Sequence, residues 1–538
     1  DTAGGDDLVV VDGASPVRQV DTITLSGDVS SVYTVNVDDL SVSYTAQAGD
    51  TLTDVRAGLV GAINADSDLS QTVTASGGDS GDEIVLMAIE GGVDGEFLIN
   101  EYTSNDQSHP SSVMLSDGRI LVTWQDSSGH DGGSSWDIWG RMTDTRGNPV
   151  GDEFRINTYT GNNQEYPSVA ALSDGGFLVA WEDDSGYMGG SSDDIRAQRY
   201  DANGDMVGPE FRVNSYTSDN QREVEVLGLS DGGFVVTWSD YSGYSGGNNY
   251  DVRMQRYDSD GEAVGDTEMV NQYVNSNQHE PSMDELADGS VIVTWYDSNR
   301  SDIYARLYDE DGAIGDEFRI NSYTSSTQSN PDVTALSDGG YVVTWQDTSG
   351  HDGGSSSDIR GQRYDSDSTM VGDEFRVNTY TSSEQYDPSV TALDGGGFVV
   401  AWESNQQDES GYGVYAQVYG ADGESVGTEF LVNVHTASDQ TNPSVVATPG
   451  GGFLVTWQSY NQDGSSQGIY SRRFGSDGQP LSFASSVDVE EATGSTQELI
   501  RLFGTIEAGD IYEVTVNEEV VPYTAQSGQT LSDVRQGL

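Results

Sequence analysis

The stretch N-P-D-V-T-A-L-S-D-G-G-Y-V-V-T-W, residues 330–345, decides the fold of this chain. Its two ends have the β-branched and aromatic composition of strands, and Ser337-Asp-Gly-Gly340 between them is a tight turn in which glycine can adopt positive φ. Variants of the stretch recur with a fixed period. The final tryptophans are spaced by 57, 57, 57, 50, 57 and 55 residues, at Trp124, Trp181, Trp238, Trp295, Trp345, Trp402 and Trp457. Units that are too small to bury their own apolar face indicate a repeat architecture.

Each repeat supplies four strands, which is the content of a propeller blade. After Trp345, residues 358–364 alternate apolar and polar residues, and residues 374–378 form an outer strand with the motif E-F-R-V-N. The outer motif occurs seven times, but its first copy, at Phe97, precedes the first inner strand, and the last repeat lacks one. We therefore expect a mainly β fold, a seven-bladed β-propeller in which the Phe97 strand completes the last blade and closes the ring.

A second repeat flanks the propeller. Residues 33–59 and 512–538 share the pattern Y-T-A-Q-x-G-x-T-L-x-D-V-R-x-G-L at an offset of 479 residues. In the first copy Leu52, Val55, Leu59 and Ile63 have helical spacing. We predict a small α+β module at residues 1–92, the propeller at 93–486, and an incomplete second module at 487–538. Because the second copy stops within its helix, we expect the chain to be a segment of a longer polypeptide.

The composition is strongly acidic. Ninety Asp and Glu residues stand against 22 basic residues, all of them Arg, for a formal net charge of −68. Such a field disfavours nucleic acid and anionic membrane surfaces and favours bound cations. The chain has no cysteine and no apolar run of the ~18 residues that would suggest membrane insertion.

Long loops with an aspartate at each end follow the second strand of four repeats. Carboxylates in a Gly/Ser-rich loop suit Ca²⁺, so calcium is the predicted cofactor. The alternative is that each aspartate caps the turn through backbone N–H groups. The candidate ligands are Asp126, Asp137, Asp183, Asp194, Asp240, Asp251, Asp347 and Asp358.

Residues that differ between repeats are better candidates for ligand contacts than residues present in all of them. On this ground a glycan could stack on, or hydrogen-bond to, His109, Trp136, Tyr187, Tyr244 and Tyr412. Gln107 and its six equivalents recur in every repeat, which favours a structural role. The repeated tryptophans are expected to pack between blades.

The sequence offers little sign of catalysis. Metalloprotease, nucleophile-elbow and phosphate-loop motifs are absent, and five His with no Cys or Lys leave mainly carboxylates as general bases. Carboxylate pairs able to hydrolyse glycosides remain open, because Asp is abundant. We therefore expect a protein that is not an enzyme, with a polysaccharide-active enzyme as a third alternative.

The repeat unit, F-x-V-N…Q…P-S-V…L-S-D-G-G-F-V-V-T-W, resembles repeats of very large secreted bacterial proteins of the adhesin-like and hemolysin-type calcium-binding families. The flanking pattern resembles a module of the same proteins. The resemblance implies a secreted, cell-surface segment that acts in adhesion or builds a surface fibre or layer. It also implies calcium in the surroundings and attachment to a surface or polymer, so a cell surface or glycans are the expected partners. The two copies of the flanking pattern suggest, in addition, self-association through the terminal modules. A calcium-dependent, lectin-like propeller is the alternative.

Overall fold

A computed structural model gives the structure of the chain. It describes residues 95–481 apart from short gaps at 131, 134, 146, 188–191, 244–249, 355 and 409. In the flanking segments it describes the strands named below and the helical positions 57–60 and 62. The chain divides into two compact units, one formed by residues 98–479 and the other by residues 1–97 together with 480–538.

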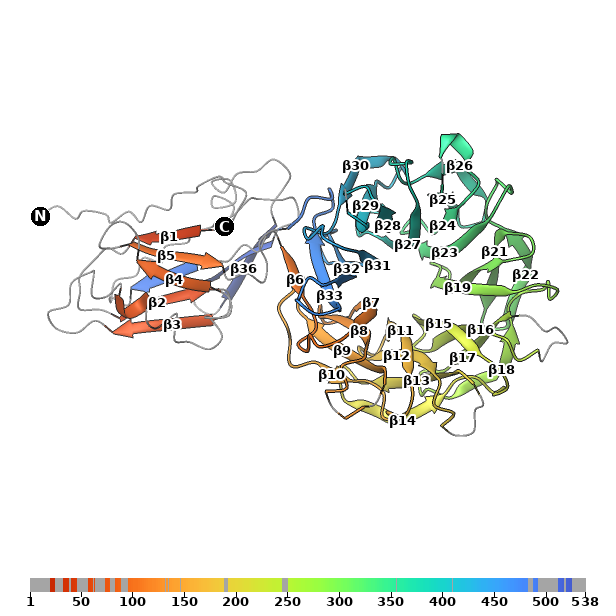
Figure 1. Cartoon of the computed structure of the whole chain (residues 1–538), viewed down its shortest axis with the longest axis horizontal. Helices are drawn as coiled ribbons and strands as arrows, with labels where there is room; N and C mark the ends of the chain where they lie inside the picture. Colours follow the sequence, from red (N-terminus) through yellow and green to blue (C-terminus); the bar gives the residue numbers. More distant parts are fainter. Residues whose placement is uncertain are drawn as a thin grey trace, which may run out of the picture. The chain divides into compact units, whose positions relative to one another are not determined.

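Seven four-stranded antiparallel sheets form a ring (Figure 1), so the predicted seven-bladed propeller is confirmed. The innermost strands of blades 1–7 are β7 (Gln107–Met114), β11 (Gln164–Ala171), β15 (Gln221–Gly228), β19 (Gln278–Glu285), β23 (Gln328–Ala335), β27 (Gln385–Ala392) and β31 (Gln440–Ala447). The second strands are β8 (Ile120–Asp126), β12 (Phe177–Asp183), β16 (Phe234–Asp240), β20 (Val291–Asp297), β24 (Tyr341–Asp347), β28 (Phe398–Asn405) and β32 (Phe453–Tyr460). These second strands are almost wholly buried, as their continuous apolar runs predict.

The third strands are β9 (Asp137–Thr143), β13 (Asp194–Tyr200), β17 (Asp251–Tyr257), β21 (Asp302–Asp309), β25 (Asp358–Tyr364), β29 (Tyr412–Tyr419) and β33 (Gln467–Phe474). The outer strands are β10 (Phe154–Arg155), β14 (Met206–Arg212), β18 (Ala263–Met269), β22 (Gly312–Arg319), β26 (Met370–Arg376), β30 (Ser425–Leu431) and, for blade 7, β6 (Glu96–Leu98). Among the described residues of the propeller, one 3-10 turn, η1 (His351–Gly353), lies in a loop of blade 5.

The N-terminal strand closes the ring, as the count of outer motifs predicts. Strand β6 is the fourth strand of the sheet β31-β32-β33-β6. Directly after it, Ile99 donates its N–H to the carbonyl of Ile469 (2.8 Å), and Ile469 donates to Asn100 Oδ1 (2.7 Å). We call the segment Ile99–Glu101 the closing segment. Strand β6 therefore covers the edge of β33, which would otherwise be unpaired.

The seven repeated tryptophans are fully buried, as expected from the sequence. Trp238 packs among Leu178, Ala180 and Ile195 of the preceding blade. Its Nε1 donates to Gln221 Oε1 (3.0 Å), and the same contact recurs in three more blades, at Trp181, Trp295 and Trp402. The repeated glutamines also donate to carbonyls in the loops between blades, as Gln107 does to Ser104 (3.1 Å). The structural role predicted for these glutamines therefore agrees with their contacts.

The prediction of two flanking α+β modules is not supported. The described strands outside the propeller are β1 (Val20–Thr24), β2 (Val32–Val37), β3 (Leu40–Thr45), β4 (Val73–Gly77), β5 (Glu83–Ala88), β34 (Val487–Glu491), β35 (Ile511–Val516) and β36 (Glu519–Thr524). They form the sheets β1-β5-β4, β3-β2-β34 and β35-β36. Helical backbone among the described residues of these segments is limited to positions 57–60 and 62, and the rest of the predicted helix lies outside the described residues.

Candidate functional site

The register of the blades places the start of each innermost strand and the long loops on the same face. In blade 2, Gln164 at the start of β11 pairs with Asp183 at the end of β12, which in turn pairs with Asp194 at the start of β13. The same pairing holds in blades 3 and 5. The first residues of the seven innermost strands therefore lie around one end of the ring axis, a position that we call the channel mouth.

A β-bulge at the third residue of every innermost strand shapes the channel mouth. The register shifts just after the second residue in all seven blades. The third residue has a left-handed backbone although it is never glycine: His109 (φ 53°), Tyr166 (55°), Glu223 (56°), Glu280 (57°), Asn330 (50°), Asp387 (48°) and Asn442 (55°). Non-glycine residues in this region cost on the order of 1 kcal/mol or more each, and such positions cluster at functional sites.

In most of these bulges the backbone N–H of the third residue donates a hydrogen bond to a side chain of the preceding blade. The acceptors of the bulge N–H groups are Gln458 for His109 (2.8 Å), Gln125 for Tyr166 (2.9 Å), Glu182 for Glu223 (2.7 Å), Glu223 for Glu280 (2.7 Å), Glu280 for Asn330 (2.7 Å) and Glu403 for Asn442 (2.7 Å). The acceptors are amides in blades 7 and 1 and carboxylates elsewhere. One arc of the mouth is therefore rich in carboxyl groups.

Two neighbouring carboxyl groups on this arc have opposite pKa shifts. Burial raises the pKa of Glu182, which is 8% exposed, to about 8, against the hydrogen bond from Glu223 N–H. Burial also acts on Glu223, but the hydrogen bond and charge of His279, with the N–H of Glu280 and the Ser239 hydroxyl, lower its pKa below the usual value. At neutral pH the first group is protonated and the second is ionised.

His279 links the next carboxyl group to this pair. Its Nδ1 lies 3.7 Å from Glu223 Oε1 and 3.6 Å from Glu280 Oε1. Burial raises the pKa of Glu280, although His279 opposes the shift. The imidazole therefore lies between the carboxyl groups of Glu223 and Glu280.

A second carboxyl pair lies in blade 6. Burial, with the charge of Asp387, raises the pKa of Glu403 to about 8. Burial also raises the pKa of Asp387, whose Oδ1 accepts a hydrogen bond from Asn330 Nδ2. Both members of this pair are thus shifted in the same direction, unlike Glu182 and Glu223.

Two residues further along the strands, a second ring of polar side chains lies deeper. Ser168 donates to Glu225 Oε2 (2.9 Å), and Ser282 donates to Asp332 Oδ1 (2.8 Å). Burial raises the pKa of Glu225 to about 8 and that of Asp332 to about 6. The hydrogen bonds of Glu225 and Asp332 join neighbouring blades below the channel mouth.

The aspartates predicted as calcium ligands are held by protein partners. Asp183, Asp240 and Asp347 accept the N–H two residues ahead through Oδ1 (2.7, 2.8 and 2.8 Å) and the Nε of Arg196, Arg253 and Arg360 through Oδ2 (2.7, 2.9 and 2.7 Å). Asp126 accepts the N–H of Ser128. Asp137, Asp194, Asp251 and Asp358 accept hydrogen bonds from Asn157, Asn214, Asn271 and Asn378 (2.7, 2.7, 2.9 and 2.9 Å). These contacts agree with the capping interpretation.

Calcium binding itself stays a prediction. In the part of the chain that the structure describes, no three His, Cys, Asp or Glu groups are arranged to hold a metal ion.

The predicted ligand-binding residues do not form one group. His109 is a bulge residue at the mouth, and its ring meets Tyr166 edge-on at 4.6 Å. Tyr187 stacks on Tyr159 at 4.5 Å, and Tyr412 lies 6.1 Å from Tyr386. Trp136 accepts the N–H of Gln164 through its carbonyl (2.9 Å), and Tyr244 lies outside the described residues.

The sequence analysis missed the other mouth residues, although a signal was present. In the repeated pattern Q-x-x-P-S the Gln recurs in all seven copies, whereas the second and third positions both vary, the third among His, Tyr, Glu, Asn and Asp. Variation behind a constant Gln marked this part of the strand, but nothing in the residue types indicates a left-handed backbone at the third position.

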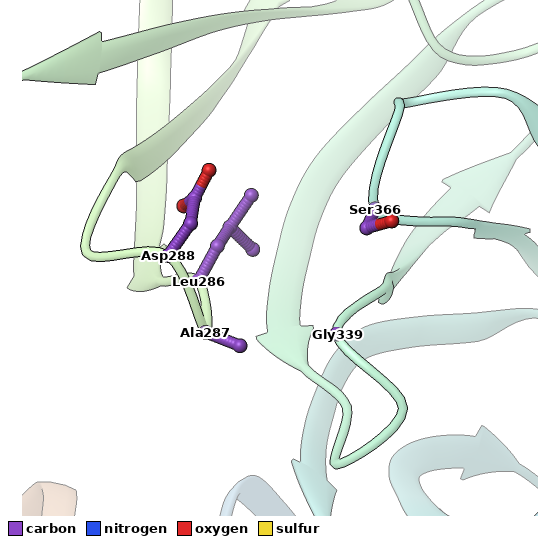
Figure 2. A pocket seen from close by; sticks show the side chains of 5 residues that line it. All are labelled: Leu286, Ala287, Asp288, Gly339 and Ser366. Carbon is purple, nitrogen blue, oxygen red and sulfur yellow. The ribbon is translucent and has the colours of Figure 1, made fainter.

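A shallow pocket of about 200 Å³ lies at the opposite end of the blades. Figure 2 shows Leu286, Ala287 and Asp288 on a turn of blade 4, across from Gly339 and Ser366 of blade 5. One exposed carboxylate among small side chains offers no acid–base pair, so we do not assign it a role in catalysis. Among the described residues, no helix has both the length and the apolar character needed to cross a membrane.

No protein-family model and no curated protein matches the chain. Solved structures do match, at low similarity. A protein of unknown function from Dyadobacter fermentans has 12% identity and a TM-score of 0.44, covering 70% of this chain and 97% of its own. NanB sialidase from Streptococcus pneumoniae has 12% identity and a TM-score of 0.40, covering 84% and 83%. An alpha-L-arabinanase from Penicillium chrysogenum has 14% identity and a TM-score of 0.38, covering 70% and 98%.

These comparisons contradict two predictions. The expected adhesive or structural role and the expected absence of enzymatic activity are corrected, because the structures that match the chain include a sialidase and an arabinanase. Membership of the adhesin-like or hemolysin-type families is not shown either. At this level of similarity the matches agree with the propeller fold, and the chemistry has to come from the channel mouth.

Proposed function

We propose that the chain hydrolyses glycosidic bonds at the channel mouth, with Glu182 as the general acid and Glu223 as the carboxylate that acts on the opposite side of the bond. The observation that carries this proposal is the contact between the two residues, in which Glu182 Oε1 accepts the N–H of Glu223 (2.7 Å), together with the opposite pKa shifts of their carboxyl groups. Two carboxyl groups whose environments separate their pKa values define an acid and a base, and glycoside hydrolysis needs such a pair.

The hydrogen bonds assign the acidic oxygen. Glu182 Oε1 accepts the N–H of Glu223, which leaves Oε2 to carry the proton. In the reaction this proton moves to the oxygen of the departing alcohol as the bond to the anomeric carbon breaks. Glu223 supplies the electron pair, either directly to the anomeric carbon or by taking a proton from the attacking water. The configuration of the released sugar distinguishes the two routes.

Aromatic side chains beside the pair suit a sugar substrate. Tyr166 is the third residue of β11, which pairs with the strand that carries Glu182, and it is 44% exposed. Burial, with the charge of Glu182, raises the pKa of its hydroxyl. Tyrosine provides an apolar face and a polar tip, which together match the C–H and O–H groups of a pyranose or furanose ring. We therefore infer that Tyr166 forms part of the substrate platform.

The test is hydrolysis of a panel of nitrophenyl glycosides by the purified chain and three variants. Glu182→Gln should lower the rate by roughly 10²- to 10⁴-fold, the usual contribution of a general acid, and Glu223→Gln should also abolish turnover. Glu403→Gln is the matched control, because Glu403 holds the same position in blade 6 and has a similarly raised pKa. Activity that survives in Glu182→Gln but disappears in Glu403→Gln would move the reaction to blade 6. A panel with no turnover at any pH would overturn the proposal.

A further inference from the structure

Four ring-bearing side chains follow one another beside the proposed carboxyl pair, in blades 3 and 4. The ring centroid of Tyr241 lies 4.7 Å from that of Tyr250. The Tyr250 ring lies 6.3 Å from that of His279, which in turn lies 5.1 Å from that of Tyr296. We call these four side chains the aromatic row. It leads from the long loop of blade 3 to β20 in blade 4.

Backbone contacts place the aromatic row at the channel mouth. The carbonyl of Tyr250 accepts the N–H of Gln278, the first residue of β19 (2.8 Å). His279 is the next residue of the same strand, and its Nδ1 lies 3.7 Å from Glu223 Oε1. The row therefore reaches the carboxyl group that we propose as the base.

The frame of the propeller does not require aromatic residues at these positions. Residues directly before the third strand, where blade 3 has Tyr250, are serines in blades 4 and 5, Ser301 and Ser357. By the strand register, the position of Tyr296 holds polar residues in the other six blades: Gln125, Glu182, Ser239, Gln346, Glu403 and Gln458. The packing of the blades therefore does not explain the aromatic row.

Aromatic rings also lie on the other side of the carboxyl pair. Tyr166 belongs to blade 2, and the ring of His109 in blade 1 meets it edge-on at 4.6 Å. Since consecutive blades are neighbours in the ring, Glu182 of blade 2 and Glu223 of blade 3 stand between these two rings and the aromatic row. A sugar chain that crosses the pair can therefore contact rings on both sides of it.

Several of these groups are open to solvent. Tyr241 is 37% exposed, and the side chain of Glu223 is 40% exposed. Exposed apolar groups that gather in one place mark binding surfaces more often than single exposed residues do. Tyrosine also combines an apolar face with a hydroxyl, so it can contact both the C–H and the O–H groups of a sugar.

The charges at the channel mouth favour an uncharged sugar chain. The carboxyl groups of Glu223 and Glu280 lie on either side of His279. The nearby guanidinium of Arg222 is held by Asp193 (2.5 Å), and the whole chain has a formal net charge of −68. An anionic sugar would approach this face against electrostatic repulsion.

We propose that the channel mouth binds a chain of several uncharged sugar residues, which runs from Tyr166 across the carboxyl pair onto the aromatic row. The bond above Glu182 and Glu223 is then an internal bond of that chain. Neighbouring rings are spaced by about the length of one sugar residue, so successive sugars contact successive rings. This inference rests on the proposed function, because it takes Glu182 and Glu223 as the reacting pair.

Titration calorimetry with the Glu182→Gln chain tests the proposal, since this variant retains the binding surface but turns over slowly. The probes are linear dimers and hexamers of xylose, arabinose and glucose. At least one hexamer should bind about ten-fold more tightly than its dimer, because it contacts more rings. A hexamer of galacturonic acid, which is anionic, should bind more weakly than that neutral hexamer. If no neutral hexamer binds better than its dimer, or if the galacturonic acid hexamer binds equally well, the proposal is wrong.

Substitutions of Tyr241 show where the sugar chain lies. Tyr241→Ala should weaken hexamer binding by about ten-fold, whereas Tyr241→Phe keeps the ring and should retain most of the affinity. Tyr460→Ala is the matched control, because Tyr460 holds the same position in blade 7 and is 43% exposed. Both tyrosines donate their N–H to the residue before the innermost strand, Asn220 and Asp439 (2.9 Å each).

The control should leave hexamer binding unchanged, and thermal melting checks that each variant is folded. Unchanged binding in Tyr241→Ala, or an equal loss in Tyr460→Ala, would overturn the proposal.

The reaction products separate this inference from the proposed function. The parent chain should first cut an end-labelled hexamer at internal bonds, so that labelled fragments of intermediate length precede the monomer. Release of single sugars from the start would overturn the inference and leave hydrolysis by the carboxyl pair in place. If no glycoside of any length is hydrolysed, the proposed function fails, and the titration by itself decides whether the aromatic row binds a sugar chain.

Discussion

Replacing Glu182 with glutamine should stabilise the fold while it removes activity. Glu182 is buried and accepts the N–H of Glu223 through Oε1 (2.7 Å). The chain itself shows that glutamine fits, because Gln125 and Gln458 accept the same bulge N–H in other blades (2.9 and 2.8 Å). The variant therefore keeps the hydrogen bond and changes only the capacity to ionise.

The size of the effect follows from the pKa. The folded pKa of Glu182 is about 8 and its usual value is 4.5, so the stability of the neutral form is fully present below 4.5 and is lost as the pH rises through about 8. Each pH unit in that window costs ~1.4 kcal/mol. The glutamine side chain cannot ionise, so the variant does not lose this stability as the pH rises. We expect it to be more stable than the parent by up to about 3 kcal/mol at pH 7 and equal to it near pH 4.

Urea unfolding at a series of pH values measures this difference, with tryptophan fluorescence as the signal. Glu403→Gln should show a similar gain, since burial and its neighbour raise the pKa of Glu403 to about 8 as well. The reasoning is refuted if Glu182→Gln destabilises the fold at pH 7, or if the difference from the parent does not change with pH. A gain in stability together with loss of glycoside hydrolysis would identify a carboxyl group kept buried for its chemistry.

Three other predictions concern the frame of the propeller. Trp238→Ala should cost ~3–5 kcal/mol and lower the melting temperature in calorimetry, because Trp238 fills the space between blades 2 and 3 and bonds Gln221; a loss below ~1 kcal/mol would contradict its packing role. Arg196→Met should cost ~3–5 kcal/mol, since buried Asp183 and Glu210 lose their cation, and an unchanged unfolding midpoint would argue against that pairing. Calcium is expected to raise the melting temperature more than magnesium at equal ionic strength. Identical melting curves in calcium, magnesium and sodium chloride would contradict specific calcium binding and indicate that the salts only screen the acidic surface.

The sequence predicted the propeller because its signals are local and repeated. Composition identified the buried second strands, and the Phe97 motif ahead of the first repeat indicated how the ring closes. The bulge at the channel mouth could not be predicted, because five different residue types occupy one left-handed position that usually favours glycine. The acid and the base of the proposed pair also depend on burial, and Glu182 and Glu223 look alike in the sequence.

The role of the loop aspartates could not be predicted from the sequence either. Paired aspartates suggested calcium, but their partners, such as Arg196 for Asp183 and Asn214 for Asp194, lie 13 and 20 residues away in the sequence.

The most direct measurement of the central claim is the fate of water oxygen during hydrolysis of a glycoside by this chain. The reaction is run in water labelled with oxygen-18, with a glycoside that the panel shows to be cleaved. The masses of the products are measured by mass spectrometry. The account predicts that the label enters the released sugar at the anomeric carbon, at a rate that collapses in Glu182→Gln and Glu223→Gln and persists in Glu403→Gln. Label that enters the sugar equally fast in all variants, or no labelled sugar from any glycoside, would contradict a carboxyl pair acting at the channel mouth.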